Sequence, residues 1–263
     1  MFQSCHPRIL LAVISALAPA GVSAQHHGQH PPANASAVAP AVSEPQGVFA
    51  VRSFGAFRNM MQKQDYTSKI VLGEVKGLGA TEAVGALSSL RGEITMIDGR
   101  FIVSYGGGCA NCPPPHAEDA TLLGAGRVAE WTPPISLSAD LSGRALDEFI
   151  LAQAKSIGLD MGKPFPVRLK GMLLNVEMHV IEAPNAGFTG HGSKVHMAKQ
   201  DEYRHGSLAG EVVGFYAPSA MQGVLSHPGE PFHFHWVDEQ RTRTAHLDAF
   251  GMQSGALLML PKK

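Results

Sequence analysis

Apolar residues recur at two different spacings along the chain, and these spacings predict its elements. Residues 143–157 carry apolar side chains at helical spacing, and Gly158 directly after them provides a stop, which predicts a long helix. A shorter helix is expected at 57–64, where Met60 and Met61 would face the core. Both segments show the period of an amphipathic helix rather than the alternation of a strand.

Alternation of apolar and polar residues predicts strands over much of the remaining chain. Residues 90–105 form two alternating runs around Asp98-Gly99, a turn pair that accepts positive φ, which predicts a β-hairpin. Glu93 and Thr95 would share one face of its first strand. Further strands are expected at 165–169, 174–181, 210–216, 232–236, 244–250 and 256–260. Many strands and one long helix indicate the α+β class, with antiparallel or mixed sheets.

The first part of the chain lacks either period. Arg8 precedes an apolar run at 9–14, and the small-residue pattern Val-Ser-Ala ends at Ala24, which is typical of a secretory signal. Residues 25–47 hold almost no large apolar side chain, so a flexible tail is expected. The sequence thus predicts a signal peptide (1–24), a tail (25–47), a folded domain (48–263) and export from the cell. An uncleaved membrane anchor is the alternative.

Composition and charge limit the classes of partner that the protein could bind. The 263 residues carry a formal net charge of −1, and the basic residues are scattered, so the footprint of a protein that binds nucleic acid or an anionic membrane is missing. No run after the signal reaches the ~20 apolar residues of a membrane helix. We expect a small-molecule partner, and the sequence also allows a homodimer.

Two cysteines remain after the expected cleavage. Cys109 and Cys112 lie in a loop at 106–115 that is rich in Gly and Pro. A zinc site there would need two more ligands, and only His116 is local. Export permits disulfides, so we expect these cysteines to pair.

Three histidines suggest a metal site. A strand at 232–236 would project His233 and His235 to one face and aromatic side chains to the other. His246 follows eleven residues later, which allows the chain to turn through 238–241 and return. Three neutral imidazoles suit zinc and leave one position for water or substrate. Three further histidines of a polar segment are expected to be solvated loop residues: His191, His196 and His205.

Two alternatives to this metal site remain open. His233 and His235 are also compatible with a pair of hydrogen-bonded core histidines. With Glu239 they resemble the first metal motif of the cupins, although the second cupin motif is not found downstream.

The order of several short motifs resembles the acetolactate decarboxylases. Their zinc-binding half is similar to residues 210–218, Gly223, 233–235, 238–241 and 245–248 of this chain. Upstream, residues 90–93 with Asp98-Gly99 and Phe101 resemble the hairpin of that family, and residues 167–171 resemble its strand that bears an essential arginine. The similarity runs from about Phe57 to Leu260.

This resemblance implies an α+β fold of the acetolactate decarboxylase type and zinc-dependent decarboxylation of an α-hydroxy-β-keto acid, acetolactate to acetoin. Zinc held by His233, His235 and His246 would act as a Lewis acid. Arg168 would bind the substrate carboxylate through a bidentate pair, and Glu93 would protonate the carbon that loses carbon dioxide. Without the resemblance, both residues would be interpreted as solvated strand positions.

Some positions depart from the family pattern. Ala86 stands where the family has a threonine, and the loop at 227–230 is longer before the histidines. The family also carries an acidic residue in a C-terminal extension, whereas residues 261–263 follow soon after the last expected strand. A diverged exported metalloprotein, with another carbonyl substrate or none, is therefore the second expectation.

Overall fold

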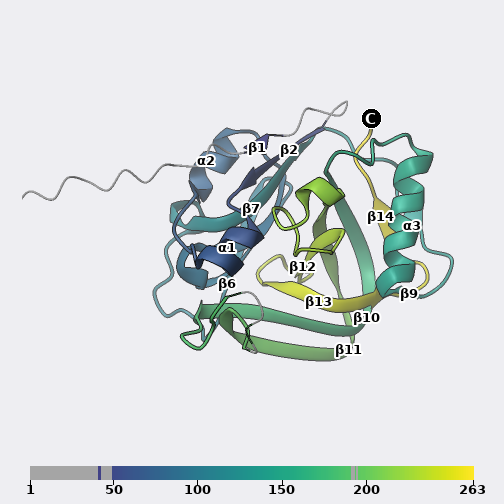
Figure 1. Cartoon of the computed structure of the whole chain (residues 1–263). Helices are drawn as coiled ribbons and strands as arrows, with labels where there is room; N and C mark the ends of the chain where they lie inside the picture. Colours follow the sequence, from purple (N-terminus) through teal and green to yellow (C-terminus); the bar gives the residue numbers. More distant parts are fainter. Residues whose placement is uncertain (1–40, 43–48, 191–192, 194) are drawn as a thin grey trace, which may run out of the picture. The chain divides into compact units, whose positions relative to one another are not determined.

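The computed structural model describes residues 41–42, 49–190, 193 and 195–263 (Figure 1). The expected signal peptide and most of the expected tail lie outside this part. Within the segment expected as a tail, Ala41–Val42 forms strand β1, which pairs with Ser53 and Arg52 of the next strand. Among the described helices, none combines the length and the apolar character needed to cross a bilayer.

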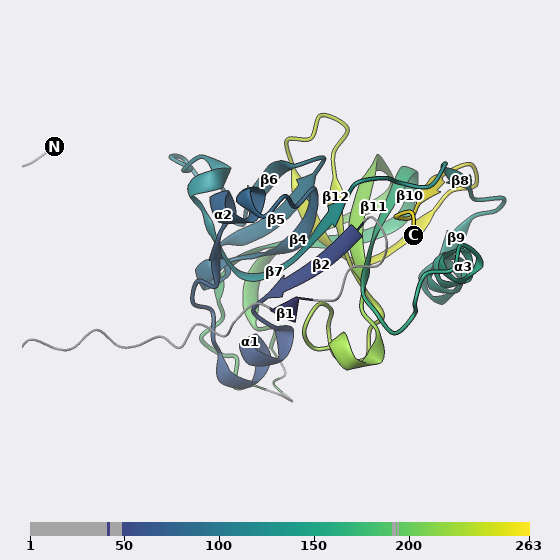
Figure 2. The ribbon, with the colours of Figure 1, turned by 90° about the horizontal axis from the view of Figure 1, so that it is seen from above.

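The described chain forms two antiparallel sheets, which confirms the predicted α+β class (Figures 1 and 2). The first sheet has the order β1-β2-β7-β4-β5-β6, with β3 paired to β7. Its further strands are β2 (Phe49–Phe54), β3 (Ile70–Val71), β4 (Glu82–Leu87), β5 (Gly92–Ile97), β6 (Arg100–Tyr105) and β7 (Asp119–Val128). The predicted hairpin is β5 and β6, with its turn at Asp98-Gly99.

The second sheet has the order β8-β14-β10-β11-β12-β13-β9. Its strands are β8 (Ile135–Ser136), β9 (Leu141–Ser142), β10 (Phe165–Pro184), β11 (Ala198–Tyr216), β12 (Phe232–Val237), β13 (Thr244–Met252) and β14 (Leu257–Met259). Strand β13 pairs with β12 and also with the second half of β10, so β10 to β13 close into a ring. This closure brings the expected metal ligands onto neighbouring strands.

Three α-helices accompany the described sheets: α1 (Phe57–Lys63), α2 (Leu72–Gly77) and α3 (Gly143–Ser156). Short 3₁₀ turns lie at Ser88–Leu90, Pro115–Ala117 and Ser219–Met221. Figure 1 shows α3 beside β9 at one edge of the second sheet. The predicted bounds of α1 and α3 are confirmed to within one residue, and Gly158 has the positive φ of a helix stop. Met60 is buried as predicted, whereas Met61 is only partly buried.

The two strands predicted at 165–169 and 174–181 are one continuous strand, β10. The expected strands left residues 170–173 unassigned, but the backbone continues as a strand through Gly171, and Ala256 lies against this glycine. A Cβ at Gly171 would lie 2.9 Å from the Cβ of Ala256. Here glycine marks a close approach of two chain segments rather than a turn.

Apolar side chains fill the space between the two sheets. Phe215 of β11 is fully buried and packs against Gly124 and Gly126 of β7. A Cβ at either glycine would lie 3.1 Å from a neighbouring side chain, Leu225 at Gly124 and Phe215 itself at Gly126. The absence of side chains on this part of β7 therefore lets the sheets approach each other closely.

An ion network also joins the sheets, with Arg168, Glu82 and Glu211 buried and Asp98 half exposed. Arg168 of β10 donates to Asp98 in the β5–β6 turn at 2.7 Å and to Glu211 of β11 at 2.8 Å. Arg241 reaches the same two carboxylates at 2.8 and 2.9 Å, and Glu82 of β4 lies 3.7 Å from Arg168. Burial raises the pKa of Glu82 to about 8, although the charge of Arg168 opposes this shift. Arg168 is thus the cation around which three acidic side chains gather.

Replacement of Arg168 by methionine should destabilise the fold, because three acidic groups would lose their buried cation. We expect a loss of about 3–5 kcal/mol in the free energy of unfolding, measured by urea denaturation. Arg144→Met is the matched control, since Arg144 pairs with Glu148 on the exposed face of α3 and such pairs contribute about 0.5 kcal/mol or less. Equal losses in the two variants would contradict a structural role for the Arg168 network.

Candidate metal centre

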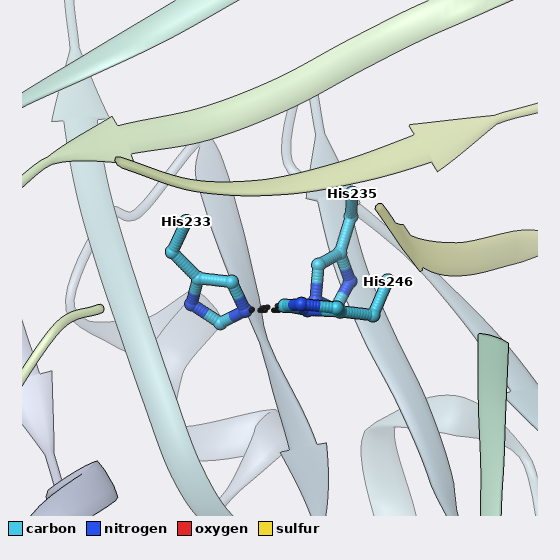
Figure 3. Close-up of side chains that lie close together, drawn as sticks. All are labelled: His233, His235 and His246. Carbon is cyan, nitrogen blue, oxygen red and sulfur yellow. Dashed lines mark hydrogen bonds between the residues drawn. The ribbon is translucent and has the colours of Figure 1, made fainter. Parts of the chain in front are cut away.

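Three histidine side chains converge between the sheets (Figure 3). His233 and His235 leave the same face of β12, as the alternation predicted, and Phe232 stacks on Phe234 on the other face. The chain then turns and returns as β13, where His246 pairs directly with His235. The predicted route to the third histidine is therefore confirmed.

The nitrogen atoms of these histidines are spaced as a metal ion requires. Nε2 of His233 lies 3.1 Å from Nε2 of His235 and 3.2 Å from Nδ1 of His246. Nitrogens bound to one tetrahedral zinc at the usual Zn–N distance would be ~3.3 Å apart. All three side chains offer ligand atoms within 4.8 Å of one another, so the described chain places three histidines where they can bind a metal.

The second nitrogen of His233 fixes its tautomer. Nδ1 lies 3.0 Å from the carbonyl oxygen of Leu225 and must donate to it, because a carbonyl only accepts. In the neutral ring Nε2 then carries a lone pair. This lone pair points toward the two other imidazoles, as the coordination of one shared metal ion requires.

A chain of hydroxyl groups fixes His235 in the same way. Thr244 donates to the carbonyl oxygen of Trp236 at 2.9 Å, so its oxygen accepts from Thr95 at 2.6 Å. Thr95 has then used its proton and accepts from Nδ1 of His235 at 3.2 Å. Nε2 of His235 is left unprotonated on the side of His233. Such outer hydrogen bonds orient metal-ligating histidines and set their tautomer.

Burial keeps the three rings neutral. It lowers the pKa of His233 to about 3, and the neighbouring His227 contributes to this shift. Burial and the nearby imidazoles lower the pKa of His235 and of His246 well below the usual histidine value. Neutral imidazole is the form that binds a metal ion, so the donor set fits a divalent metal.

Glu93 lies beside the histidines. Its carboxylate is 3.7 Å from Nε2 of His235 and 3.9 Å from Nε2 of His179, and its residue is only 4% exposed. It shares a face of β5 with Thr95, as predicted from the alternation. Burial raises the pKa of Glu93 to about 7, although the charge of His179 opposes this shift. Ala86, which stands directly opposite Glu93 on β4, lines the same cavity.

The structure does not bring Arg168 to the histidines, unlike the sequence-based expectation. Val213 of β11 stands between Arg168 and His235 in the strand register. The guanidinium group is engaged by Asp98 and Glu211. None of the three cavities lined by His233 or His246 is lined by Arg168. The resemblance of residues 167–171 to a family strand could not reveal where Arg168 lies, because its distance from the histidines depends on how the strands of the second sheet are arranged.

His179 and Asp248 were missed by the sequence analysis. His179 lies opposite His246 in the β10–β13 register, with ring centroids 4.8 Å apart. Nδ1 of His179 lies 2.8 Å from Asp248. Burial would lower the pKa of His179, but Asp248 and Glu93 outweigh it and the pKa is raised. No sequence spacing links residues 179 and 246, so only the register brings them together.

Three cavities are lined by metal ligands, and two of them adjoin, since His179, His227 and His246 stand in the walls of both. The inner cavity, of about 30 Å³, is lined by Glu93, His179 and His233 together with apolar side chains. The outer cavity, of about 420 Å³, is lined by polar residues such as His179 and Asp248 and also by Met61, Pro228 and Leu247. His196 is an exposed loop residue as predicted, and it also lines both cavities. His205 is exposed but lies in strand β11, and His191 lies outside the described residues.

Cys109 and Cys112 form a disulfide, as predicted, and both are exposed. The bond closes a short turn of the loop that follows β6. The two cysteines line a separate groove, and neither contributes an atom to the three-histidine group.

The fold and site define a class of metal-binding α+β domain with three buried histidines between antiparallel sheets. A model of the alpha-acetolactate decarboxylase family matches residues 54–261, and the chain belongs to this family. This family assignment rules out the alternative that the chain is a cupin. A search among curated proteins finds no match.

Solved structures share the fold. The alpha-acetolactate decarboxylase from Bacillus subtilis strain 168 is 17% identical with a TM-score of 0.62, covering 80% of this chain and 85% of that chain. The acetolactate decarboxylase from Bacillus subtilis subspecies spizizenii is 16% identical with a TM-score of 0.63 and the same coverage. A Staphylococcus aureus protein of unknown function, similar to alpha-acetolactate decarboxylase, is 16% identical with a TM-score of 0.58, covering 79% and 83%.

Replacement of His235 by alanine should remove most of the bound metal, because one of three ligands is lost. We expect bound zinc to fall from about one ion per chain to well below half, together with a lower melting temperature. Thr95→Val should weaken metal affinity by about 10- to 100-fold, since the ring of His235 loses its orienting partner. His205→Ala is the control, and undiminished zinc in His235→Ala by elemental analysis would refute the assignment.

Proposed function

We propose that the protein is a zinc-dependent decarboxylase of an α-hydroxy-β-keto acid, with acetolactate as substrate and acetoin as product. The observation that carries the proposal is the buried carboxyl group of Glu93, which lies 3.7 Å from His235 and shares a cavity with the two other histidines of the metal group, His233 and His246. The family assignment supports the reaction class, and it indicates a small-molecule substrate. Three imidazole ligands favour zinc among divalent metals.

His233, His235 and His246 would hold the ion. When bound, zinc would supply Lewis-acid stabilisation for the negative charge that develops on the substrate as carbon dioxide leaves. The chain's own contribution is to keep these histidines neutral and correctly oriented. Burial keeps the rings neutral, and the hydrogen bonds to Leu225 and to the Thr95–Thr244 pair orient His233 and His235.

Glu93 would supply the proton that replaces carbon dioxide. An acid for this step must hold a proton near neutral pH and release it toward the substrate. Burial raises the pKa of Glu93 into this range, and its carboxyl group faces the inner cavity. Phe57, Met60 and Leu90 line the same cavity, and their apolar side chains limit the access of bulk water to this proton.

A second candidate is a related metalloprotein that acts on another carbonyl compound or does not turn over a substrate. Two observations favour it. Ala86 offers no hydroxyl group opposite Glu93, and Arg168 is engaged in the ion network between the sheets. This candidate would bind zinc with the same three histidines.

The zinc-loaded protein should convert racemic acetolactate to acetoin and carbon dioxide. Glu93→Gln should lower kcat by about 10²- to 10⁴-fold, the usual contribution of a positioned acid, while zinc content stays at about one ion per chain. Glu82→Gln is the matched control, because Glu82 is equally buried in the same sheet and contacts the Arg168 network instead. Full zinc occupancy without either product would favour the second candidate.

We also propose that the protein is exported, on the strength of the signal-like segment 1–24 in the sequence. Expression of the full chain should yield a mature protein in the extracytoplasmic fraction whose N-terminal residue is Gln25, as determined by mass spectrometry. Replacement of apolar residue Leu11 by arginine should retain the uncleaved chain in the cytoplasm. A full-length product in the soluble cytoplasmic fraction of the unmodified chain would contradict export.

A further inference from the structure

A groove away from the metal centre contains a reactive group of its own. It has a volume of about 450 Å³, and both cysteines of the Cys109–Cys112 disulfide line it. Its described wall contains neither the three histidines of the metal group nor Glu93. The role of this groove is therefore independent of the proposed decarboxylation.

The disulfide in the groove is accessible and short-ranged. Cys109 and Cys112 are both exposed and lie three positions apart. A cross-link over so few residues removes little conformational freedom from the unfolded chain, so it stabilises a fold less than a bridge across a long loop does. Exposed disulfides are the ones that thiols reduce most readily, and two cysteines separated by two residues favour the thiolate that must leave. These features indicate a reactive bond rather than a purely structural one.

The loop that carries the disulfide is held in place by other contacts. The backbone N–H of Gly106 donates to the carbonyl oxygen of Ile181 at 3.0 Å, and that of Gly107 donates to the carboxylate of Asp201 at 2.8 Å. Ile181 belongs to β10 and Asp201 to β11. Reduction of the disulfide would not break these hydrogen bonds, so the bond can open and close again in the folded protein.

The remaining wall of the groove suits a small organic ligand. Aromatic and apolar side chains make up much of it, among them Tyr105, Tyr203, Trp236, Met178 and Leu208. The residue Tyr203 is 41% exposed, which is high for so large a side chain. Concave sites of roughly 300–1,000 Å³ with such a lining are typical of small-molecule binding.

Arg243 gives the groove its charge. The described wall has no other arginine or lysine and no acidic residue. The guanidinium group lies over the ring of Trp236, 5.9 Å from the ring centroid, and its hydrogen bond to Asp238 uses Nε. The two terminal nitrogens are left to donate to a carboxylate. A ligand that complements this wall therefore carries negative charge.

We propose that the groove binds a small thiol that bears a carboxylate, and that this thiol exchanges with the Cys109–Cys112 disulfide. The thiolate of the ligand attacks one cysteine sulfur, the S–S bond breaks, and the other cysteine leaves as a thiolate. A second molecule of the thiol attacks the mixed disulfide and releases the ligand as its own disulfide. Two ligand thiols are oxidised, one protein disulfide is reduced, and the two protons of the ligand thiols end on the cysteines.

The test uses glutathione, a small thiol with two carboxylates, and its diethyl ester, in which both carboxylates are blocked. Reduction of the zinc-loaded protein is followed by rapid alkylation and mass spectrometry. The rate should saturate as glutathione rises, because the thiol binds before it reacts. At equal thiolate concentration, glutathione should react about 10- to 100-fold faster than the ester, the usual effect of one hydrogen bond between charged groups.

Variants of the groove separate charge from apolar contact. Arg243→Gln should lower the rate with glutathione to that with the ester, and Arg243→Lys should keep part of the difference because the charge remains. Leu208→Ala should raise the half-saturating glutathione concentration by about 3- to 10-fold through lost apolar contact. Met172→Ala is the matched control, since Met172 is also an exposed apolar residue of the second sheet but does not line the groove. Unchanged melting temperatures would show that the variants remain folded.

Three results would overturn the proposal. A disulfide that stays closed during prolonged incubation with excess glutathione would be a structural cross-link. A rate that rises linearly with glutathione, or that is equal for glutathione and the ester, would exclude binding in the groove before exchange. The same shift in Met172→Ala as in Leu208→Ala would mean that the groove has no specific part in the reaction.

Discussion

Closure of the second sheet is the constraint on which the site depends. Because β13 pairs with β12 on one side and with β10 on the other, His235, His246 and His179 come into one row across three strands. Cross-strand neighbours in such a row project to the same face. The row faces the first sheet, where buried imidazoles have little water to satisfy them. Their polar atoms must find protein groups, a metal or a substrate.

The β5–β6 hairpin of the first sheet contacts the second sheet at two places. Glu93 and Thr95 of β5 face the histidines, and Asp98 at the end of the same hairpin binds Arg168. The contacts with the histidines and the contact with Arg168 thus lie at opposite ends of one short hairpin. Any displacement of the hairpin would affect both ends, so the ion network around Arg168 also helps to hold Glu93 and Thr95 against the second sheet.

Local patterns in the sequence predicted the parts of this arrangement that depend on neighbouring residues. The faces of β5 and β12, the return of β13 and the limits of α3 follow from periods of two and 3.6 residues, and all are confirmed. Strands β4 and β7 were missed because they are buried on both faces and show no alternation. The positions of Arg168 and His179 depend on the bend and closure of β10, which brings together residues with no fixed spacing in the sequence.

The two cavities also set the polarity and size of what can bind. The inner cavity is about 30 Å³ and is walled largely by apolar side chains such as Leu90 and Leu122, so it has room for a group no larger than a methyl or a water molecule. The outer cavity is wider and mixed in character, with charged and polar groups such as His179 and Asp248 beside Met61 and Leu247 in its wall. A ligand that spans both would therefore direct a small apolar substituent inward and a charged group outward. The proposed substrate, a small keto acid with methyl substituents, has this distribution, whereas a bulky group on the inner side would clash with the close-packed side chains that line the inner cavity.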